Sequence, residues 1–234
     1  MRVGVIQSAY IPWRGYFDFI ASVDLFVFHD DIQYTKADWR NRNRIKTQRG
    51  CIWLTVPVSY YKTSQLICDT LINNATNWRR SQLNHWNESY GKAKYIDDVL
   101  DILSCLDNLE DLTISQLNIR LIRRICSYLG ISTPLMLSSD LNLEGTKTDR
   151  LINLLKKVDG KTYLSGPSAD GYLDKAIFKH HGIRLEYKSY DYEPYPQLWG
   201  EFEGAVTILD LIANVGPESK KYLCSRTTNE EVVA

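Results

Sequence analysis

The order of apolar runs and turns at the start of the chain constrains the fold more than any other sequence feature. Residues 2–6 (RVGVI) form an apolar run typical of a buried strand, and residues 16–23 (YFDFIASV) follow a turn with the pattern of a short helix. A second apolar run then stops at the carboxylates Asp30 and Asp31. Strand, turn, helix and strand in this order predict an α/β fold with a mainly parallel sheet flanked by helices.

Polar side chains follow both predicted strands. Gln7 comes directly after the first strand, and Asp30 and Asp31 come directly after the second. Ligands of parallel sheets gather beyond the carboxyl ends of the strands, so these three residues are candidate catalytic residues. The two carboxylates could bind Mg²⁺, act as a base toward an amine, or accept hydrogen bonds from ribose or sugar hydroxyls. Capping of the next turn is an equally good interpretation. His29 falls on the other strand face, and we interpret it as structural.

The rest of the chain adds further elements to this opening. Residues 41–58 alternate between polar and apolar positions around the polar link QRG, which predicts a β-hairpin, and residues 64–72 suit one further strand. Residues 77–130 have helical periodicity. The α/β alternation then resumes, with strands predicted at 133–139, 161–166 and 183–190 and helices at 146–158, 171–182 and 204–216.

No repeat, low-complexity segment or long linker divides these elements. We therefore predict a single α/β domain over residues 1–225, with a helical insertion at about 77–130. The polar end of the chain, residues 226–234, is predicted to be a disordered tail.

Composition excludes several classes of protein. Hydrophobic residues make up 44% of the chain and charged residues 24%, as in ordinary soluble globular proteins. The 28 basic and 28 acidic residues cancel, so binding to a polyanion would need a local patch. The five cysteines are odd in number, widely spaced and not in CxxC pairs, which argues against a disulfide framework and against a zinc knuckle. Because no signal peptide or membrane span is visible, we expect a cytoplasmic protein without membrane insertion.

The stretch at residues 39–46 (WRNRNRIK) is the strongest local concentration of charge. Arg40, Arg42, Arg44 and Lys46 stand at every second position, so an extended strand would place these cations on one face. Two arginine side chains can hold a diphosphate, which fits a nucleotide or nucleotide-sugar better than a nucleic acid duplex. A solvated strand face is the other interpretation of the same pattern.

Neighbouring residues favour the ligand-binding interpretation of this stretch. Trp39 supplies a flat surface for stacking on a base or sugar, while Asn41 and Asn43 supply amide donors and acceptors. Gln33 lies just upstream, beyond the second strand. All four residues are candidates for substrate binding.

The turn after the first strand resembles the opening of nucleotidyltransferases and pantothenate synthetases, whose motif has the form PxHxGH. Pro12, Trp13 and Gly15 lie in the corresponding run, but neither histidine of the motif is present. The resemblance therefore implies a nucleotidyltransferase-like, Rossmann-like geometry without the phosphate-activating histidines. Trp13 and Gly15 are candidates for substrate binding, and so is Tyr10 in the same aromatic run.

Two later strand-to-helix connections are also candidate ligand contacts. In EGTKTDRL, Lys147 lies at the start of a predicted helix, where an anion is favoured, although the phosphate-loop pattern GxxxxGK[ST] is not satisfied. In YLSGPSADGYLD, Ser165, Gly166 and Ser168 form a tight loop whose amides can approach a ligand closely. An ordinary strand-to-helix turn is the alternative for the second segment.

Several runs taken together resemble the WbqC-like proteins, which are encoded in bacterial O-antigen and related polysaccharide loci. The similar runs are IQSAYIPWRGYFDFIASVDLFVFHDDIQYTKADWRNRNRIKT, WLTVPV, YLSGPSADGYLD, YPQLWGEF and LDLIANVG. The family typically opens with His-Gln-Pro, whereas this chain has Ile6, Gln7 and Ser8. The positions that match the family are Gln7, Tyr10, Pro12, Gly15, Asp31, Gln33, Trp39, Asn41, Arg42, Asn43, Arg44, Ser165, Gly166, Ser168 and Asn214.

The resemblance implies a function in polysaccharide biosynthesis. WbqC-like proteins are associated with placing glycine on the amine of a nucleotide-linked amino sugar. In this hypothesis Arg42 and Arg44 hold the diphosphate, Trp39 or Tyr10 stacks on the base or sugar, and Asp31 takes the proton from the attacking amine. Bringing the amine and the acyl carbon together contributes roughly 7 to 11 kcal/mol.

The acyl donor and the protein class both stay open at this point. ATP with Mg²⁺ as activator, an acyl-carrier thioester and an aminoacyl-tRNA are alternative donors. A non-catalytic nucleotide-sugar-binding protein of the same pathway and an RNA-binding module are alternative functions. The sequence does not indicate the oligomeric state.

Overall fold

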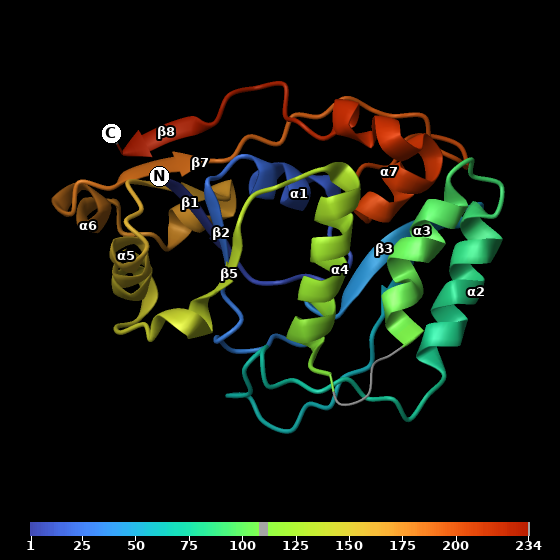
Figure 1. Cartoon of the computed structure of the whole chain (residues 1–234), viewed down its shortest axis with the longest axis horizontal. Helices are drawn as coiled ribbons and strands as arrows, with labels where there is room; N and C mark the ends of the chain where they lie inside the picture. Colours follow the sequence, from blue (N-terminus) through green and yellow to red (C-terminus); the bar gives the residue numbers. More distant parts are fainter. Residues whose placement is uncertain (108–111, 234) are drawn as a thin grey trace.

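The computed structural model describes residues 1–107 and 112–233, and its centre is a six-stranded sheet (Figure 1). The strand order is β5 (Leu135–Leu137), β2 (Leu25–Phe28), β1 (Arg2–Ile6), β6 (Thr162–Ser165), β7 (Arg184–Tyr187) and β8 (Glu230–Val233). The first five of these strands run parallel to one another, whereas β8 runs antiparallel to β7. The predicted α/β fold with a mainly parallel sheet is therefore confirmed.

The chain reverses its direction across the sheet at β1. It runs from β1 to β2 and then to β5 on one side, and it returns to place β6 and β7 on the other side of β1. In doubly wound sheets the crevice outside the carboxyl ends of the two strands at such a reversal is the usual ligand site. Here that crevice lies where β1 ends at Ile6 and β6 ends at Ser165.

Helices cover both faces of the sheet because successive strand residues alternate between the two faces. Val3 and Val5 of β1 pack in one core with α5 (Lys147–Lys157) and α6 (Lys175–His180). Phe26 and Phe28 of β2 pack in a second core on the opposite face. The helices of this second core include α1 (Arg14–Ala21), α4 (Ile114–Leu129) and α7 (Ile208–Val215).

The connection between β2 and β5 holds the helical insertion. Residues 77–130 contain α2 (Trp78–Tyr90), α3 (Ile96–Leu103) and α4, as the periodicity predicts. The N-terminus of α4 is fixed by a capping box between Thr113 and Gln116, and Gly130 ends the helix with φ +62°. Short 3₁₀ helices complete the chain at Ser104–Asp107, Ser138–Leu141, Pro167–Gly171 and Gly216–Tyr222.

The predicted hairpin is confirmed and forms a separate two-stranded sheet. Strands β3 (Arg42–Thr47) and β4 (Gly50–Thr55) pair antiparallel through a two-residue turn. Arg40 lies before β3, so it does not share the strand with the other cations. Residues 64–72 do not form the suggested further strand, because they make only isolated bridges such as Val58 with Ile72.

The prediction of a disordered tail is wrong. Glu230–Val233 forms β8, which pairs with β7 at the edge of the sheet, and Val233 is buried in the core beside α5 and α6. The run EVV is too short and too close to acidic residues to stand out as a strand. Pairing with an edge strand supplies the hydrogen bonds that the local sequence does not predict.

Within the described ranges, 1–107 and 112–233, no helix is both long enough and apolar enough to span a bilayer.

Candidate functional site

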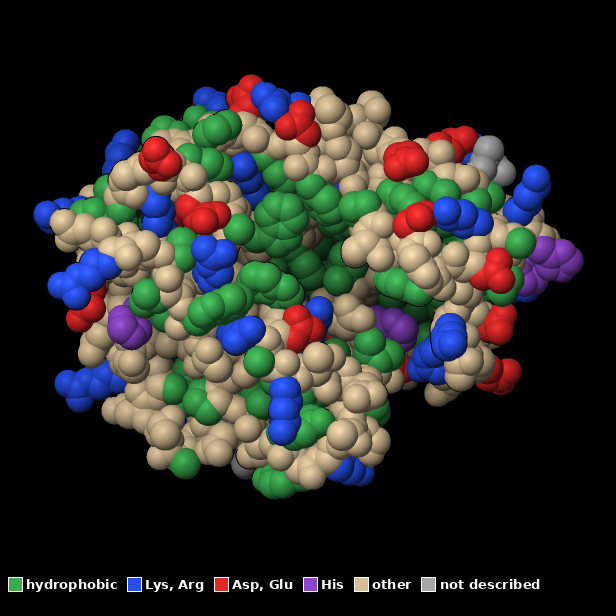
Figure 2. Space-filling model, turned by 180° about the vertical axis from the view of Figure 1, so that it is seen from behind, with side chains coloured by type: hydrophobic (Ala, Val, Ile, Leu, Met, Phe, Trp, Pro, Cys, Tyr) green, Lys and Arg blue, Asp and Glu red, His purple; other side chains and the backbone are tan. Residues whose placement is uncertain are grey.

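Two adjoining hollows open at the carboxyl ends of β1 and β6. Their volumes are about 400 Å³ and about 960 Å³, and the larger one extends to Ser165 and to α5. Figure 2 shows a hollow lined with hydrophobic side chains on one face of the molecule, with both basic and acidic side chains around it. Both volumes are bordered by Ile6, Trp13, Tyr16, Trp39 and Arg40, so we treat them as one cavity.

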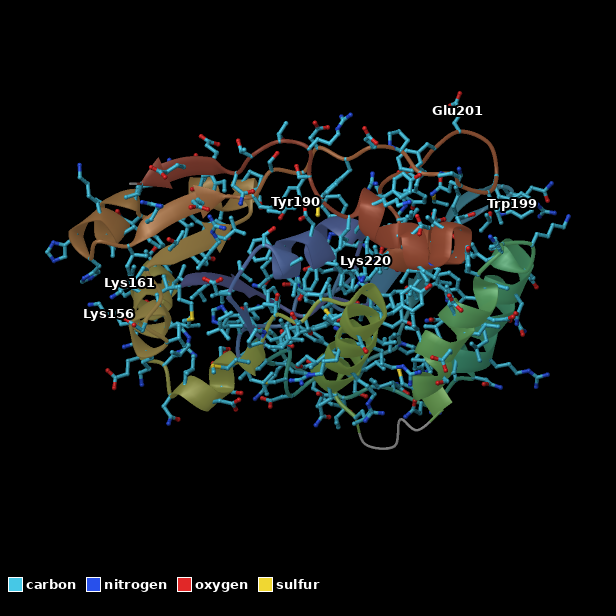
Figure 3. All side chains as sticks on the ribbon, turned by 45° about the horizontal axis from the view of Figure 1, so that its top comes forward. Lys156, Lys161, Tyr190, Trp199, Glu201 and Lys220 are labelled. Carbon is cyan, nitrogen blue, oxygen red and sulfur yellow. The ribbon has the colours of Figure 1, made fainter. Side chains whose placement is uncertain are left out.

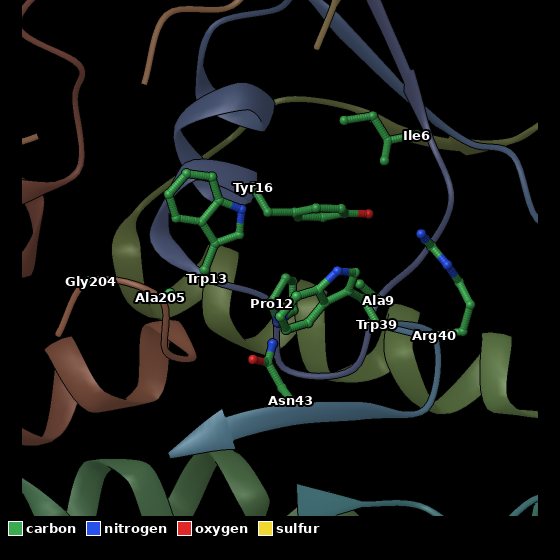
Figure 4. Close-up of a pocket in the computed structure, with 10 residues that line it drawn as sticks. All are labelled: Ile6, Ala9, Pro12, Trp13, Tyr16, Trp39, Arg40, Asn43, Gly204 and Ala205. Carbon is green, nitrogen blue, oxygen red and sulfur yellow. The ribbon is translucent and has the colours of Figure 1, made fainter. Parts of the chain in front are cut away.

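Aromatic side chains form much of the cavity wall. Trp13 and Trp39 are 36% and 44% exposed, and Figure 4 shows their indoles and the ring of Tyr16 around the smaller hollow. Trp13 also packs on Tyr190, with ring centroids 5.3 Å apart. A Cβ added to Gly15 would lie 2.3 Å from Cζ2 of Trp13. The bare glycine is therefore required for the position of this indole.

The charged groups that line the cavity are basic. Arg40 lies beside Trp39, and Lys147 stands at the N-terminus of α5. The backbone φ of Lys147 is +49°, a strained value for a residue with a side chain. Among the described residues, neither Asp nor Glu lines the cavity. The cavity therefore favours an anionic ligand with flat, stackable groups.

Hydrogen bonds brace the loop that follows β1. The backbone N–H of Ser8 donates to Asp30 Oδ1 at 2.8 Å, and Arg40 Nη1 donates to the Ser8 carbonyl oxygen at 3.0 Å. The Tyr16 hydroxyl donates to the Gln7 carbonyl oxygen at 3.0 Å. Burial and the charge of Asp30 raise the pKa of Tyr16, which therefore remains a donor. Together these bonds fix the backbone at the floor of the cavity.

A strained residue in the same loop is held by β3. Ile11 is buried with φ +36°, which is unusual for a β-branched side chain. The side-chain amide of Asn43 donates to the carbonyl oxygens of Tyr10 and Ile11 at 3.1 and 2.9 Å. Asn43 thus connects the hairpin to the loop and stabilises its conformation.

His29, at the end of β2, is the titratable imidazole of the cavity. Its Nε2 lies 3.7 Å from Asp31 Oδ1 and is buried without a hydrogen-bond partner among the described residues. Burial lowers the pKa of His29; the charge of Asp31 opposes this shift, and that of Arg150 adds to it. Asp31 itself accepts hydrogen bonds from Arg150 and Ser138. The imidazole is therefore neutral near pH 7, beside a carboxylate that is already engaged.

Comparison with known proteins gives the relationship of this chain. The model of the WbqC-like protein family matches residues 7–222. The chain belongs to this family. Rv1507c of Mycobacterium tuberculosis (strain ATCC 25618 / H37Rv) is 49% identical to it over 228 residues, which cover 95% of this chain and 97% of that protein. No solved structure matches the chain.

The WbqC-like protein brings some of the predicted site residues together and separates others. The predicted residues that line the cavity are Gln7, Trp13, Trp39, Asn43, Lys147, Ser165, Gly166 and Ser168. Those that do not line it are Tyr10, Gly15, Asp30, Asp31, Gln33, Asn41, Arg42, Arg44 and Asn214.

The cations of β3 point away from the cavity. Because Asn43 faces the cavity, Arg42 and Arg44 lie on the opposite strand face. Arg42 stacks over Trp53 at 4.2 Å, and Arg44 Nη2 lies 3.3 Å from Glu203 Oε2. Alternation along the strand places the two arginines together as predicted, but the face they share is outside the cavity.

Several other candidates have structural contacts. Tyr10 is fully buried and donates to Gln82 Oε1 at 2.6 Å. The side-chain amide of Asn41 donates to the Val56 carbonyl oxygen at 2.9 Å. Asn214 accepts from the backbone N–H of Leu198 at 3.1 Å and donates to Asp210. Gln33 is exposed and forms an isolated bridge with Leu66.

Sequence reasoning missed part of the site of this WbqC-like protein. His29 and Arg40 were visible as neighbours of Asp30 and of Trp39, so sequence adjacency was an available signal. Tyr190 and Arg150 reach the site from segments far along the chain and carry no local signal. Within the described ranges, no cluster of three His, Cys, Asp or Glu side chains is placed to hold a metal ion.

Proposed function

We propose that this WbqC-like protein transfers an aminoacyl group, in the leading form glycyl, onto the amine of a nucleotide-linked amino sugar during surface polysaccharide biosynthesis. The observation that carries the proposal is the cavity at the sheet reversal. Its stacking surfaces, Trp13 and Trp39, stand beside the cations Arg40 and Lys147, with no carboxylate among the described residues that line it. Each of its two hollows falls in the size range of ligand pockets.

The binding mode follows from the placement of charge. Arg40 and Lys147 take the diphosphate in this proposal, in place of the Arg42 and Arg44 pair expected from the sequence. Trp13 and Trp39 stack on the base or sugar. The side-chain amide of Gln7, which makes no hydrogen bond within the described chain, is available to a sugar hydroxyl at the end of β1.

The nucleotidyltransferase-like character of the opening is part of the same proposal. The turn after β1 carries Trp13 into the cavity. Counted back from Gly15, Trp13 stands at the position of the first motif histidine, whereas counted from Pro12 that position is Arg14. Arg14 points elsewhere, since its Nη1 donates to the Glu193 carbonyl oxygen at 2.7 Å and its guanidinium lies 4.7 Å from the ring of Tyr192. In this proposal the turn serves ligand binding.

Acyl transfer needs a group that accepts a proton from the attacking amine. His29 is assigned this role because a neutral imidazole lines the cavity. Asp31, the base expected from the sequence, is less suited to this role, because Arg150 and Ser138 already donate hydrogen bonds to its oxygens. ATP with Mg²⁺, a carrier thioester and an aminoacyl-tRNA are the candidate acyl donors.

Calorimetry with a dTDP-linked amino sugar tests the binding step, and mass spectrometry for an added glycyl unit tests the transfer. We expect Trp13→Ala and Lys147→Ala each to weaken binding roughly tenfold. Lys161→Ala is the matched control, because Lys161 is exposed at the far end of the molecule (Figure 3) and pairs with Asp159.

Two results would count against the proposal. Binding without mass gain for every donor class would indicate the non-catalytic nucleotide-sugar-binding protein. Equal binding by the wild type, Trp13→Ala and Lys147→Ala would place the ligand outside this cavity.

A further inference from the structure

A strongly basic segment surrounds the hairpin next to the cavity. Residues 34–62 contain seven Lys or Arg and one Asp, whereas the whole chain has a net charge of zero. The same segment contains Tyr34, Trp39, Trp53, Tyr60 and Tyr61. Interleaved cations and aromatic rings are the usual surface of proteins that bind single-stranded nucleic acid.

Part of this segment lines a separate hollow outside the cavity, which we call the outer hollow. The hollow has a volume of about 320 Å³ and is lined by Lys36, Arg42 and Tyr60 among other residues, with no carboxylate among those described. Lys36 Nζ lies 4.2 Å from the ring of Tyr60, and Arg42 lies 4.2 Å from the ring of Trp53. Each cation is thus held beside an aromatic face.

Contacts between side chains connect this outer hollow to the cavity through two tryptophans. Trp39 lines the cavity, and its ring centroid lies 5.3 Å from that of Trp53, the partner of Arg42. Both indoles are 44% exposed. We call the resulting row of side chains the aromatic track, and it consists of Trp39, Trp53, Arg42, Tyr60 and Lys36.

We infer that the aromatic track binds the single-stranded 3′ end of an aminoacylated RNA, and that this RNA is the acyl donor. The donor role rests on the function proposed above. A row of stacking surfaces with a cation at each step matches successive bases and phosphates. ATP offers one base and a carrier thioester offers none, so neither uses a track that extends outside the cavity.

The track leads the 3′ end toward the acceptor amine. In the transfer step the sugar amine attacks the carbonyl carbon of the ester on the terminal ribose. The C–N bond forms and the C–O ester bond breaks. The amine proton passes to His29, and the released ribose oxygen takes up a proton to become a hydroxyl. The ester supplies the activated acyl group, so this step consumes no nucleoside triphosphate.

The first experiment measures binding to a fluorescein-labelled, ten-nucleotide single-stranded RNA ending in CCA, by fluorescence anisotropy at 50 and 200 mM KCl. Two phosphates neutralised by Lys36 and Arg42 give a slope of about −1.4 in log affinity against log salt, or a loss of roughly sevenfold between the two salt concentrations. We expect Trp53→Ala to weaken binding roughly tenfold and Arg42→Ala to reduce the slope by about 0.7.

Controls separate the track from a loss of folding. Trp53→Phe keeps a stacking ring and should restore most of the affinity, and Lys161→Ala should bind as the wild type does. Thermal melts identify any variant that unfolds. Wild-type affinity in both Trp53→Ala and Arg42→Ala would overturn the inference, as would a failure of the wild type to bind the RNA.

The second experiment supplies glycine as a ribose ester on total tRNA or as a carrier thioester, with a dTDP-linked amino sugar as acceptor. Glycyl transfer from the RNA ester, lost in Trp53→Ala while nucleotide-sugar binding is kept, supports the inference. Transfer from the thioester alone overturns the inference and leaves the proposed function intact. A cavity that binds no nucleotide-sugar overturns the proposed function and the donor role together, even where RNA binds the track.

Discussion

Arg40 and Lys46, near the two ends of the basic stretch at residues 39–46, are both cationic but lie in different surroundings. Arg40 lines the cavity, and its Nη1 donates to the Ser8 carbonyl oxygen. Lys46 is 5% exposed and donates to Gln197 Oε1 at 2.8 Å and to the Glu201 carbonyl oxygen. Arg40 also pairs with Asp38, with its Nε 3.6 Å from Asp38 Oδ2, but it still borders the cavity, whereas Lys46 is enclosed by protein groups.

The surroundings of Lys46 form a buried polar network. Asp210 of α7 accepts hydrogen bonds from the Tyr195 hydroxyl and the Gln197 amide, both at 2.6 Å, and from the Tyr90 hydroxyl. Burial raises the pKa of Asp210, and the three hydrogen bonds and the charge of Lys46 oppose that shift. The network connects the hairpin to α2 and α7. A pattern of alternating cations therefore predicts a shared strand face but not what covers that face.

The largest expected effect is a loss of stability at the buried end. Lys46→Met removes the charged donor that satisfies Gln197 and the Glu201 carbonyl, so the free energy of unfolding should fall by about 3 kcal/mol. Urea denaturation measures this loss, with Lys161→Met as the exposed control. An unchanged urea midpoint would contradict a structural role for Lys46.

The next largest effect is expected at the cavity end. Arg40→Ala should weaken nucleotide-sugar binding by about 2 kcal/mol because a charged contact to the diphosphate is lost. Its stability should fall by only about 1.5 kcal/mol, from loss of the hydrogen bond to Ser8 and of the ion pair with Asp38. Calorimetry and urea denaturation together separate the two losses. A large loss of stability with unchanged binding would indicate that Arg40, like Lys46, has a structural role.

Lowering the pH tests the neutral state of His29 in the cavity. Because burial lowers its pKa below the ordinary 6.5, the unfolded chain takes up this proton first as the pH falls below 6.5. The unfolded state then binds more protons, so stability falls with pH, by at most about 1.4 kcal/mol per pH unit for one group. His29→Gln should show a smaller loss than the wild type in urea denaturation between pH 7 and pH 5. Parallel pH profiles would indicate that His29 titrates normally.

The smallest effect is expected midway along the stretch. Arg44 and Glu203 form an ion pair with side chains 28% and 36% exposed, and such pairs contribute little. Arg44→Ala should therefore change the free energy of unfolding by about 0.5 kcal/mol or less and leave nucleotide-sugar affinity within about twofold. A tenfold loss of affinity would instead support the diphosphate site that the sequence suggested on Arg42 and Arg44.

Much of the candidate site could be predicted where the signal was local. Three cavity residues lie at the end of predicted strands and were therefore expected at the carboxyl edge of the sheet: Gln7, Ser165 and Gly166. Asp30 was placed at the same edge, but its oxygens accept from Ser8 and Ser115 inside the molecule. Strand periodicity predicts how far along its strand a residue lies, but it does not predict which residues surround it.

The sequence by itself determined the parallel α/β opening, the hairpin and the helices, because apolar periodicity and turn residues act within a few positions of the chain. Tertiary structure alone decided which cation reaches the cavity. Gln197 and Glu201 enclose Lys46 from about 150 positions away, and Arg150 engages Asp31 from 119 positions away. Contacts at such separations leave no periodic signal in the sequence. The pairing of β8 with β7 follows the same rule, since an edge strand of four residues is stabilised by its partner.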